Sequence, residues 1–176
     1  MRNTAFFLAG MALLLVQSNL FRVLSWVHVP GLVPSLVLPL ILFMGVHEYS
    51  LARGAAVAFV LGYGTDLVGI APVGLYTFTY VAIFVLVRAA GVRLAAQTVL
   101  MQVALALAAA LVHSVMVLGL IAIFGGDAAY VPRAIYPMAV PHALSTAAIA
   151  PLIFRVSRRL HSATSTSPHV EAARGT

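Results

Sequence analysis

Three residues with ionisable side chains stand inside long apolar stretches of the sequence: Asp66, His113 and His142. A carboxylate and an imidazole can form a buried ion pair, and two imidazoles with one carboxylate form a donor set that zinc accepts. A carboxylate at the centre of a membrane costs about 3 kcal/mol on insertion scales. Asp66 therefore requires partners inside the protein, and two interpretations supply them.

In the first interpretation, Asp66 is satisfied by Tyr or Thr hydroxyls or by free N–H groups at a helix end. Pro72 and Gly74 support it, because they end the apolar run and reverse the chain one turn after Asp66. In the second, Asp66 pairs with His113 or His142 in an intramembrane polar cluster. All three residues lie about 5 Å to the same side of the centres of their segments, and residues at one depth can meet. An isolated histidine in a helix is usually only hydrogen-bonded, so we predict no metal site.

Catalytic motifs are missing from the chain. His47-Glu48 lacks the second histidine of HExxH, and neither G-x-S-x-G nor a P-loop is present. The four acidic residues are too few for paired-carboxylate chemistry, and the absence of cysteine removes thiol and iron–sulfur chemistry. We therefore predict a protein that is not an enzyme, with no catalytic residue and no cofactor.

The composition is that of an integral membrane protein. The 176 residues are 62% hydrophobic and 8% charged, whereas a soluble domain carries about a quarter charged residues. The net charge of +6 comes from arginines that stand singly between apolar segments, so it does not indicate nucleic-acid binding.

Six apolar segments predict an all-α polytopic protein with six transmembrane helices. They cover residues 4–21, 32–47, 54–70, 75–90, 95–124 and 135–155. The second is the weakest, with Pro34 expected in its first turn and a kink expected at Pro39. We expect one transmembrane domain over residues 1–160 and a disordered cytoplasmic tail over 161–176.

The arginines predict the orientation. Seven of them fall on the side that holds both termini, and two fall on the other side, which places both termini in the cytoplasm. The seven are Arg2, Arg53, Arg88, Arg93, Arg155, Arg158 and Arg159, and the two are Arg22 and Arg133.

The third segment carries a ridge of small residues at helical spacing. Gly54, Ala58, Gly62 and Asp66 follow one another at i, i+4, and Gly69 continues the ridge. Small residues let a second helix approach closely, so the ridge predicts a helix-packing surface around Asp66.

The residues around Asp66 also resemble the signature of the MreD family of rod-shape-determining membrane proteins. Gly62, Asp66 and Leu67 are followed by Pro72-Val73-Gly74-Leu75-Tyr76, and an arginine-rich end follows the sixth segment. Two positions depart from the family pattern. Pro34-Ser35-Leu36 stands where the family often has Pro-Asp or Pro-Asn, and His113 stands where an acidic residue is common.

The resemblance implies a non-catalytic scaffold of the cell-elongation machinery in the bacterial cytoplasmic (inner) membrane. It implies that the protein binds an MreC-like partner. It also implies an association with RodA, a class B penicillin-binding protein, MreB and membrane lipids in the machinery that synthesises peptidoglycan. The MreD fold is similar to that of the S components of energy-coupling-factor transporters. The alternative function is therefore an S component or small transporter subunit for a vitamin-like molecule. In that alternative, a ligand pocket would be lined by Trp26, His28, Asp127, Tyr130, Arg133 and Tyr136. The same residues could equally form a docking surface for MreC or anchor the helices at the membrane interface, as tyrosines commonly do.

Overall fold

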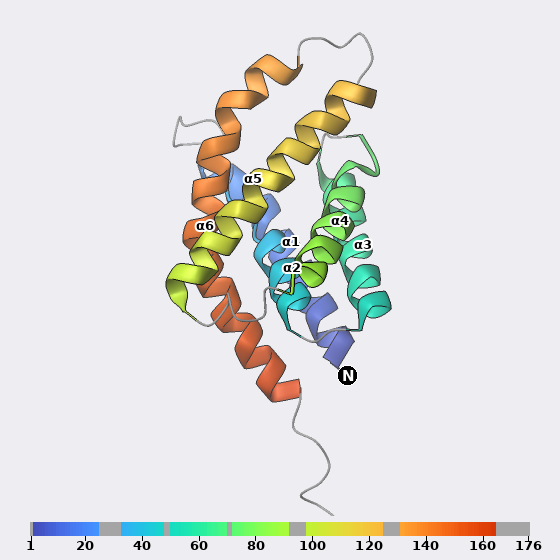
Figure 1. The fold of residues 1–176 in the computed structure, drawn as a ribbon, viewed down its shortest axis with the longest axis vertical. Helices are drawn as coiled ribbons and strands as arrows, with labels where there is room; N and C mark the ends of the chain where they lie inside the picture. The colour runs from blue at the N-terminus through green and yellow to red at the C-terminus, as the bar shows by residue number, and fades with distance from the viewer. Residues whose placement is uncertain are drawn as a thin grey trace, which may run out of the picture.

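The computed structural model describes residues 2–24, 33–47, 50–69, 72–91, 98–124 and 131–164, and all regular structure in these ranges is helical (Figure 1). The helices are α1 (Arg2–Leu24), α2 (Val37–Val46), α3 (Leu51–Val68), α4 (Leu75–Ala89), α5 (Val99–Phe124) and α6 (Val131–Thr164). They follow the six predicted segments closely. The helix α6 continues to Thr164, four residues past the expected domain boundary at residue 160, and residues 165–176 lie outside the described ranges.

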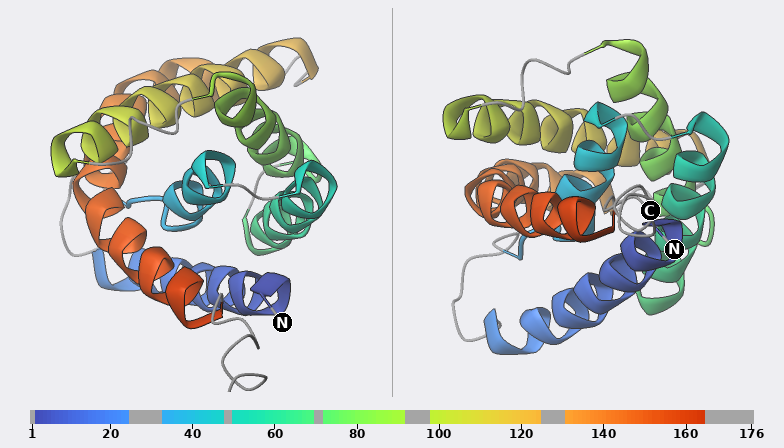
Figure 2. Two further views of the ribbon diagram at one scale, coloured as in Figure 1. Left: turned by 60° about the horizontal axis from the view of Figure 1, so that its bottom comes forward. Right: turned by 90° about the horizontal axis from the view of Figure 1, so that it is seen from below.

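The short helix α2 forms the centre of the molecule. All ten of its residues are buried, and it contacts each of the other five helices, which surround it (Figure 2). The helix begins at Val37, so Pro34 precedes it and Pro39 falls in its first turn. A proline in a first turn removes no intrahelical hydrogen bond, so the predicted places of the two prolines were wrong and no kink is required at Pro39.

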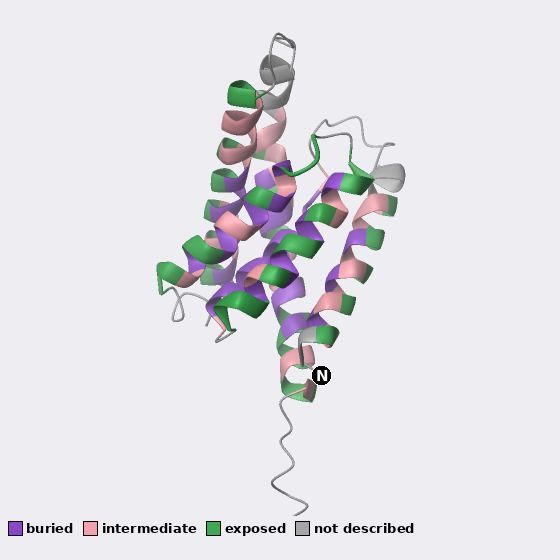
Figure 3. Ribbon diagram, turned by 90° about the vertical axis from the view of Figure 1, so that its right-hand side faces the viewer, coloured by how far each residue is buried: buried purple, intermediate pink, exposed green. Residues whose placement is uncertain are grey.

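Three helical stretches are long and apolar enough to cross a membrane, namely Leu51–Val68, Val99–Phe124 and Met138–Thr164. Shorter apolar helices cover Thr4–Leu20, Val37–Val46 and Leu75–Ala89. Large apolar side chains also cover the outside of the bundle, where exposed residues face outward along most helices (Figure 3). Leu100, for example, is 77% exposed. A surface of this kind is typical of a protein surrounded by lipid.

The start of α1 and the end of α6 lie close together at one end of the molecule (Figure 1). An aromatic cluster ties α1, α2 and α6 together there. The ring of Phe43 stacks on Phe6 with 6.0 Å between centroids and meets the edge of Phe154 at 5.8 Å. His47, directly after α2, stacks on Phe43 at 3.9 Å and lies 6.0 Å from His161.

His47 should make the protein less stable in acid. Burial lowers the pKa of the His47 imidazole from 6.5; its hydrogen bond with the Phe43 carbonyl opposes this, while His161 and Arg158 lower the pKa further. Because the unfolded chain then binds the proton more readily, the stabilisation is complete above pH 6.5 and falls as the pH drops below it. We expect the Tm in detergent to fall between about pH 7.5 and about pH 5.5, and to fall less in His47→Gln.

Ser162→Ala, which changes an exposed side chain, serves as the control for His47→Gln. Its Tm should depend on pH as that of the wild type does. Equal pH dependence in wild type and His47→Gln would show that His47 is not responsible.

Candidate functional site

Asp66 lies in the last turn of α3, where its side chain is 2% exposed. Its carboxylate accepts four hydrogen bonds from the start of α4. Oδ1 accepts the backbone N–H of Tyr76 at 2.8 Å. Oδ2 accepts the backbone N–H groups of Gly74 at 2.9 Å and Thr77 at 3.1 Å, and the Thr77 hydroxyl at 2.6 Å. Three backbone N–H groups and one hydroxyl thus donate to the two oxygens of this side chain.

These bonds make Asp66 the cap of α4, supplied by the preceding helix. The first N–H groups of a helix have no partner within the helix, and the helix dipole places partial positive charge on them. Gly74, the residue before α4, has φ of 102°, a left-handed conformation that suits glycine. The turn is closed by the N–H of Leu75, which donates to the Pro72 carbonyl at 3.2 Å. This geometry corresponds to the first interpretation of Asp66, a buried carboxylate bonded at a helix end.

The two histidines have other partners. His113 is 3% exposed, and its ring centroid lies 5.6 Å from that of Tyr76 and 5.4 Å from that of Tyr80. Its Nδ1 has no hydrogen-bond partner among the described residues. His142 Nδ1 lies 2.7 Å from the Val33 carbonyl, to which it donates. Tyr76 therefore stands between Asp66 and His113, and the described contacts of Asp66 include neither imidazole.

The described part of the chain contains no group of three His, Cys, Asp or Glu side chains that could hold a metal ion. The second interpretation, a direct Asp66–histidine pair, therefore has no bond in the structure to support it, although Tyr76 places Asp66 and His113 in the same region.

A second set of polar contacts, which we did not predict, covers the start of α2. The N–H of Ser35 donates to the hydroxyl of Thr146 in α6 at 3.0 Å, and the N–H of Leu36 donates to Oε1 of Gln17 in α1 at 2.8 Å. The Ser35 hydroxyl accepts the N–H of Leu38 at 3.3 Å. Side chains from two other helices thus satisfy backbone donors that water would satisfy at a helix end outside a membrane.

Tyr80 connects this set to α4. Its side chain is 1% exposed, and its hydroxyl lies 3.3 Å from the Ser35 hydroxyl. A serine shortly before an apolar run is an N-cap signal, so Ser35 was recognisable from the sequence. Gln17 and Thr146 carry no comparable local signal, because their role depends on α1 and α6 packing against α2.

Removing the Thr146 hydroxyl should destabilise the fold without changing the size of the side chain. In Thr146→Val, the buried Ser35 N–H loses its acceptor, at a cost of about 1–3 kcal/mol. We expect a lower Tm in detergent by circular dichroism, while Thr146→Ser, which keeps the hydroxyl, should lie close to the wild type. Equal losses in both variants would mean that packing, not the hydrogen bond, is what Thr146 contributes.

The ridge on α3 faces α4 at two glycines. A Cβ on Gly62 would lie 2.5 Å from Thr77 Cα, and one on Gly54 would overlap the ring of Phe84. Gly54, Ala58 and Gly62 are all buried. Gly69 is the exposed residue that follows the last turn of α3, so it lies beyond the buried part of the ridge.

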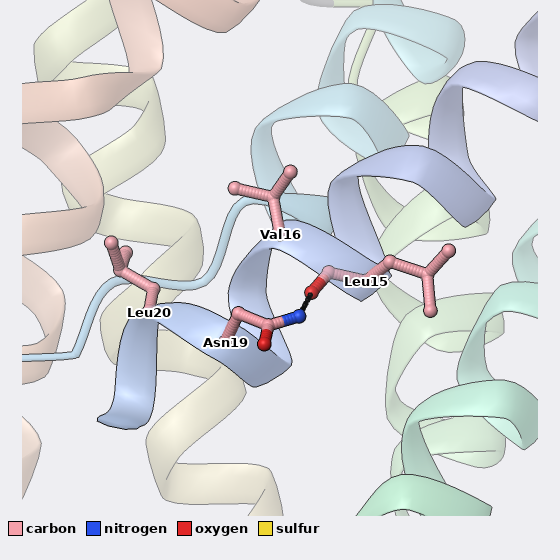
Figure 4. Close-up of a pocket in the computed structure, with 4 residues that line it drawn as sticks. All are labelled: Leu15, Val16, Asn19 and Leu20. Carbon is pink, nitrogen blue, oxygen red and sulfur yellow. Dashed lines mark hydrogen bonds between the residues drawn. The ribbon is translucent and has the colours of Figure 1, made fainter. Parts of the chain in front are cut away.

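A shallow, open hollow of about 310 Å³ lies along α1 and is lined by Leu15, Val16, Asn19 and Leu20 (Figure 4). The Asn19 amide donates one of its two N–H groups to the Leu15 carbonyl at 2.9 Å, within α1. The polar groups around Asp66 and Ser35 do not line this hollow. It offers a ligand little beyond apolar surface, as a lipid-facing groove does.

These features define a helical membrane protein whose buried polar side chains brace the ends of its helices. The chain belongs to the MreD family, because the family model described as rod shape-determining protein MreD matches residues 1–159. Its role is therefore in rod-shape determination. No curated protein and no solved structure matches the chain significantly.

The residues expected to line a ligand pocket in the transporter alternative do not belong to the described site. Trp26, His28, Asp127 and Tyr130 lie outside the described residues, as do the side chains of Arg133 and Tyr136.

Proposed function

We propose that this chain is a non-catalytic scaffold of the bacterial cell-elongation machinery, which binds an MreC-like partner in the cytoplasmic membrane. Membership of the MreD family over residues 1–159 is the observation that carries the proposal. The buried polar groups agree with a structural role, since the Asp66 carboxylate is used by backbone and hydroxyl donors of α4.

The proposed topology has six spans with both termini in the cytoplasm. Helix α1 begins and helix α6 ends at the same end of the bundle. Arg53, in the first turn of α3, and Arg88, in the last turn of α4, belong to helix ends that lie toward that same end (Figure 1). Arginine at this end agrees with the positive-inside rule. The ten residues of α2 cover only about 15 Å, so α2 would cross the membrane together with the chain that precedes it.

In the proposed mechanism, α3 and α4 act as one rigid hairpin. Asp66 holds the start of α4 and Gly62 lets the two helices touch, so the outer half of the bundle keeps a fixed shape. The single span and adjacent segment of the MreC-like partner would lie against that outer half. Asp66 would act from inside and would not contact the partner, because its side chain is buried. RodA, a class B penicillin-binding protein and MreB would associate through the same assembly.

The test is purification of the tagged protein from its native membrane in mild detergent, followed by mass spectrometry of the proteins and small molecules that elute with it. We expect an MreC-like coiled-coil protein at near-stoichiometric amount. The same protein should be lost from Asp66→Ala and retained by Gly64→Ala, whose new Cβ meets only an ordinary contact at 3.5 Å from Leu14. An ATPase pair with a coupling subunit, or a stoichiometric vitamin, would contradict the scaffold.

A further inference from the structure

Three exposed arginines form one face of the last turns of α6. Arg155, Arg158 and Arg159 are spaced i, i+3 and i+4, which places them side by side within about 6 Å along the helix axis. We call these three residues the arginine face. Guanidinium groups so arranged repel one another unless anions lie between them, so the face is a candidate binding surface for phosphate-bearing molecules.

The opposite side of the same turns is fixed by packing. Ile153, Phe154 and Ser157 are 5%, 0% and 2% exposed, and Phe154 meets the edge of the Phe43 ring in α2. The orientation of the arginine face is therefore set by the core of the bundle. A face held in this way binds at a lower entropic cost than arginines on a flexible tail.

No described acidic side chain can neutralise this face. Asp66 is the one acidic residue in the described ranges, and its oxygens are occupied at the start of α4. That start lies at the other end of the bundle from the last turns of α6 (Figure 1). Within the described residues, the arginine face therefore has no acidic partner to supply its counter-charge.

The position of the arginine face relative to the membrane indicates which anion it binds. Residues 138–154 of α6 contain no Arg, Lys, Asp or Glu and span about 25 Å, close to the thickness of the hydrocarbon core. In the membrane placement proposed above, on which this inference rests, Arg155 lies at the inner boundary of the hydrocarbon. Arg158 and Arg159 then lie within the layer of cytoplasmic headgroups, where lipid phosphates are found.

We propose that the arginine face is a binding site for anionic phospholipid of the cytoplasmic leaflet, such as phosphatidylglycerol. Two guanidinium groups can hold one phosphate through paired hydrogen bonds, and the third adds to the local positive potential. Each arginine should contribute about fivefold to the affinity for the anionic lipid.

The test is native mass spectrometry of the delipidated full chain in neutral detergent, titrated with phosphatidylglycerol or with phosphatidylcholine. The variants are Arg158→Gln, the triple variant Arg155→Gln/Arg158→Gln/Arg159→Gln, and the matched control Arg53→Gln, a lone exposed arginine in the first turn of α3. We expect preferential phosphatidylglycerol binding by the wild type, a loss of about fivefold in Arg158→Gln and a much larger loss in the triple variant. Arg53→Gln should bind as the wild type does.

Several results would overturn the proposal. They are equal binding of the two lipids, a change of less than twofold in Arg158→Gln, an equal loss in Arg53→Gln, or displacement of the lipid by millimolar inorganic phosphate. Capture of an acidic cytoplasmic protein by the wild type but not by Arg158→Gln, with lipid binding unchanged, would assign the face to a protein instead. None of these readouts depends on an MreC-like partner, so the scaffold and the lipid site can fail separately.

Discussion

Replacing Asp66 with Ala is expected to lower the free energy of unfolding by about 3–5 kcal/mol, the largest loss for a single substitution in this chain. Three backbone N–H groups, those of Gly74, Tyr76 and Thr77, would lose their acceptor at the start of α4. Lipid cannot replace the carboxylate as water could at an exposed helix end. Thermal melting in detergent, followed by circular dichroism, should show a Tm about 10 °C or more below the wild type.

Two further variants test parts of the hydrogen bonding at Asp66. Thr77→Val removes one donor and leaves the backbone bonds in place, so it should cost about 1–2 kcal/mol. Asp66→Asn keeps the size of the side chain but turns an NH₂ group toward N–H donors, so it should lie close to Asp66→Ala. A melting temperature of Asp66→Asn equal to that of the wild type would show that the cap contributes little.

Replacing Gly62 with Ala is expected to cost about 2 kcal/mol, although alanine is the better helix former. The new Cβ would lie 2.5 Å from Thr77 Cα and 2.9 Å from the Thr77 backbone nitrogen. Backbone atoms cannot turn away as a side chain can, so α3 and α4 must separate. That separation would also lengthen the hydrogen bonds between Asp66 and the start of α4.

Gly64 provides the matched control for Gly62. It lies two residues further along α3, and a Cβ there would meet only Leu14 at 3.5 Å. Gly64→Ala should therefore be neutral or stabilise the protein by up to about 1 kcal/mol. Both variants can be compared by thermal melting in one detergent. Equal melting temperatures would mean that α3 and α4 are not in close contact at Gly62.

Much of the fold was predictable, because each helix is marked by a long apolar run. The positions of the six helices followed from these runs, and the chain reversal followed from Pro72 and Gly74. Asp66 stood out because a lone carboxylate in an apolar helix needs a partner. The sequence also limited that partner to nearby hydroxyls, a helix end or a histidine, and the structure places the start of α4 beside it.

The arrangement around α2 was not predictable, because it depends on contacts between distant parts of the chain. Ser35 bonds Thr146 across 111 residues, and Leu36 bonds Gln17 on another helix. The common depth predicted for Asp66, His113 and His142 could not identify bonded partners, because Asp66 bonds the start of α4 and His142 bonds the Val33 carbonyl. Depth fixes one coordinate only, and the faces that the helices turn toward one another decide the rest.

The measurement that tests the central claim most directly is amide hydrogen exchange of the purified protein, followed by mass spectrometry, in wild type and Asp66→Asn. If Asp66 holds the start of α4, the amides of Tyr76 and Thr77 should exchange slowly in the wild type and at least tenfold faster in the variant. The middle of α5 should remain unchanged. Unchanged exchange at Tyr76 and Thr77, or faster exchange confined to the region of His113 and His142, would contradict the assignment of Asp66 as the cap of α4.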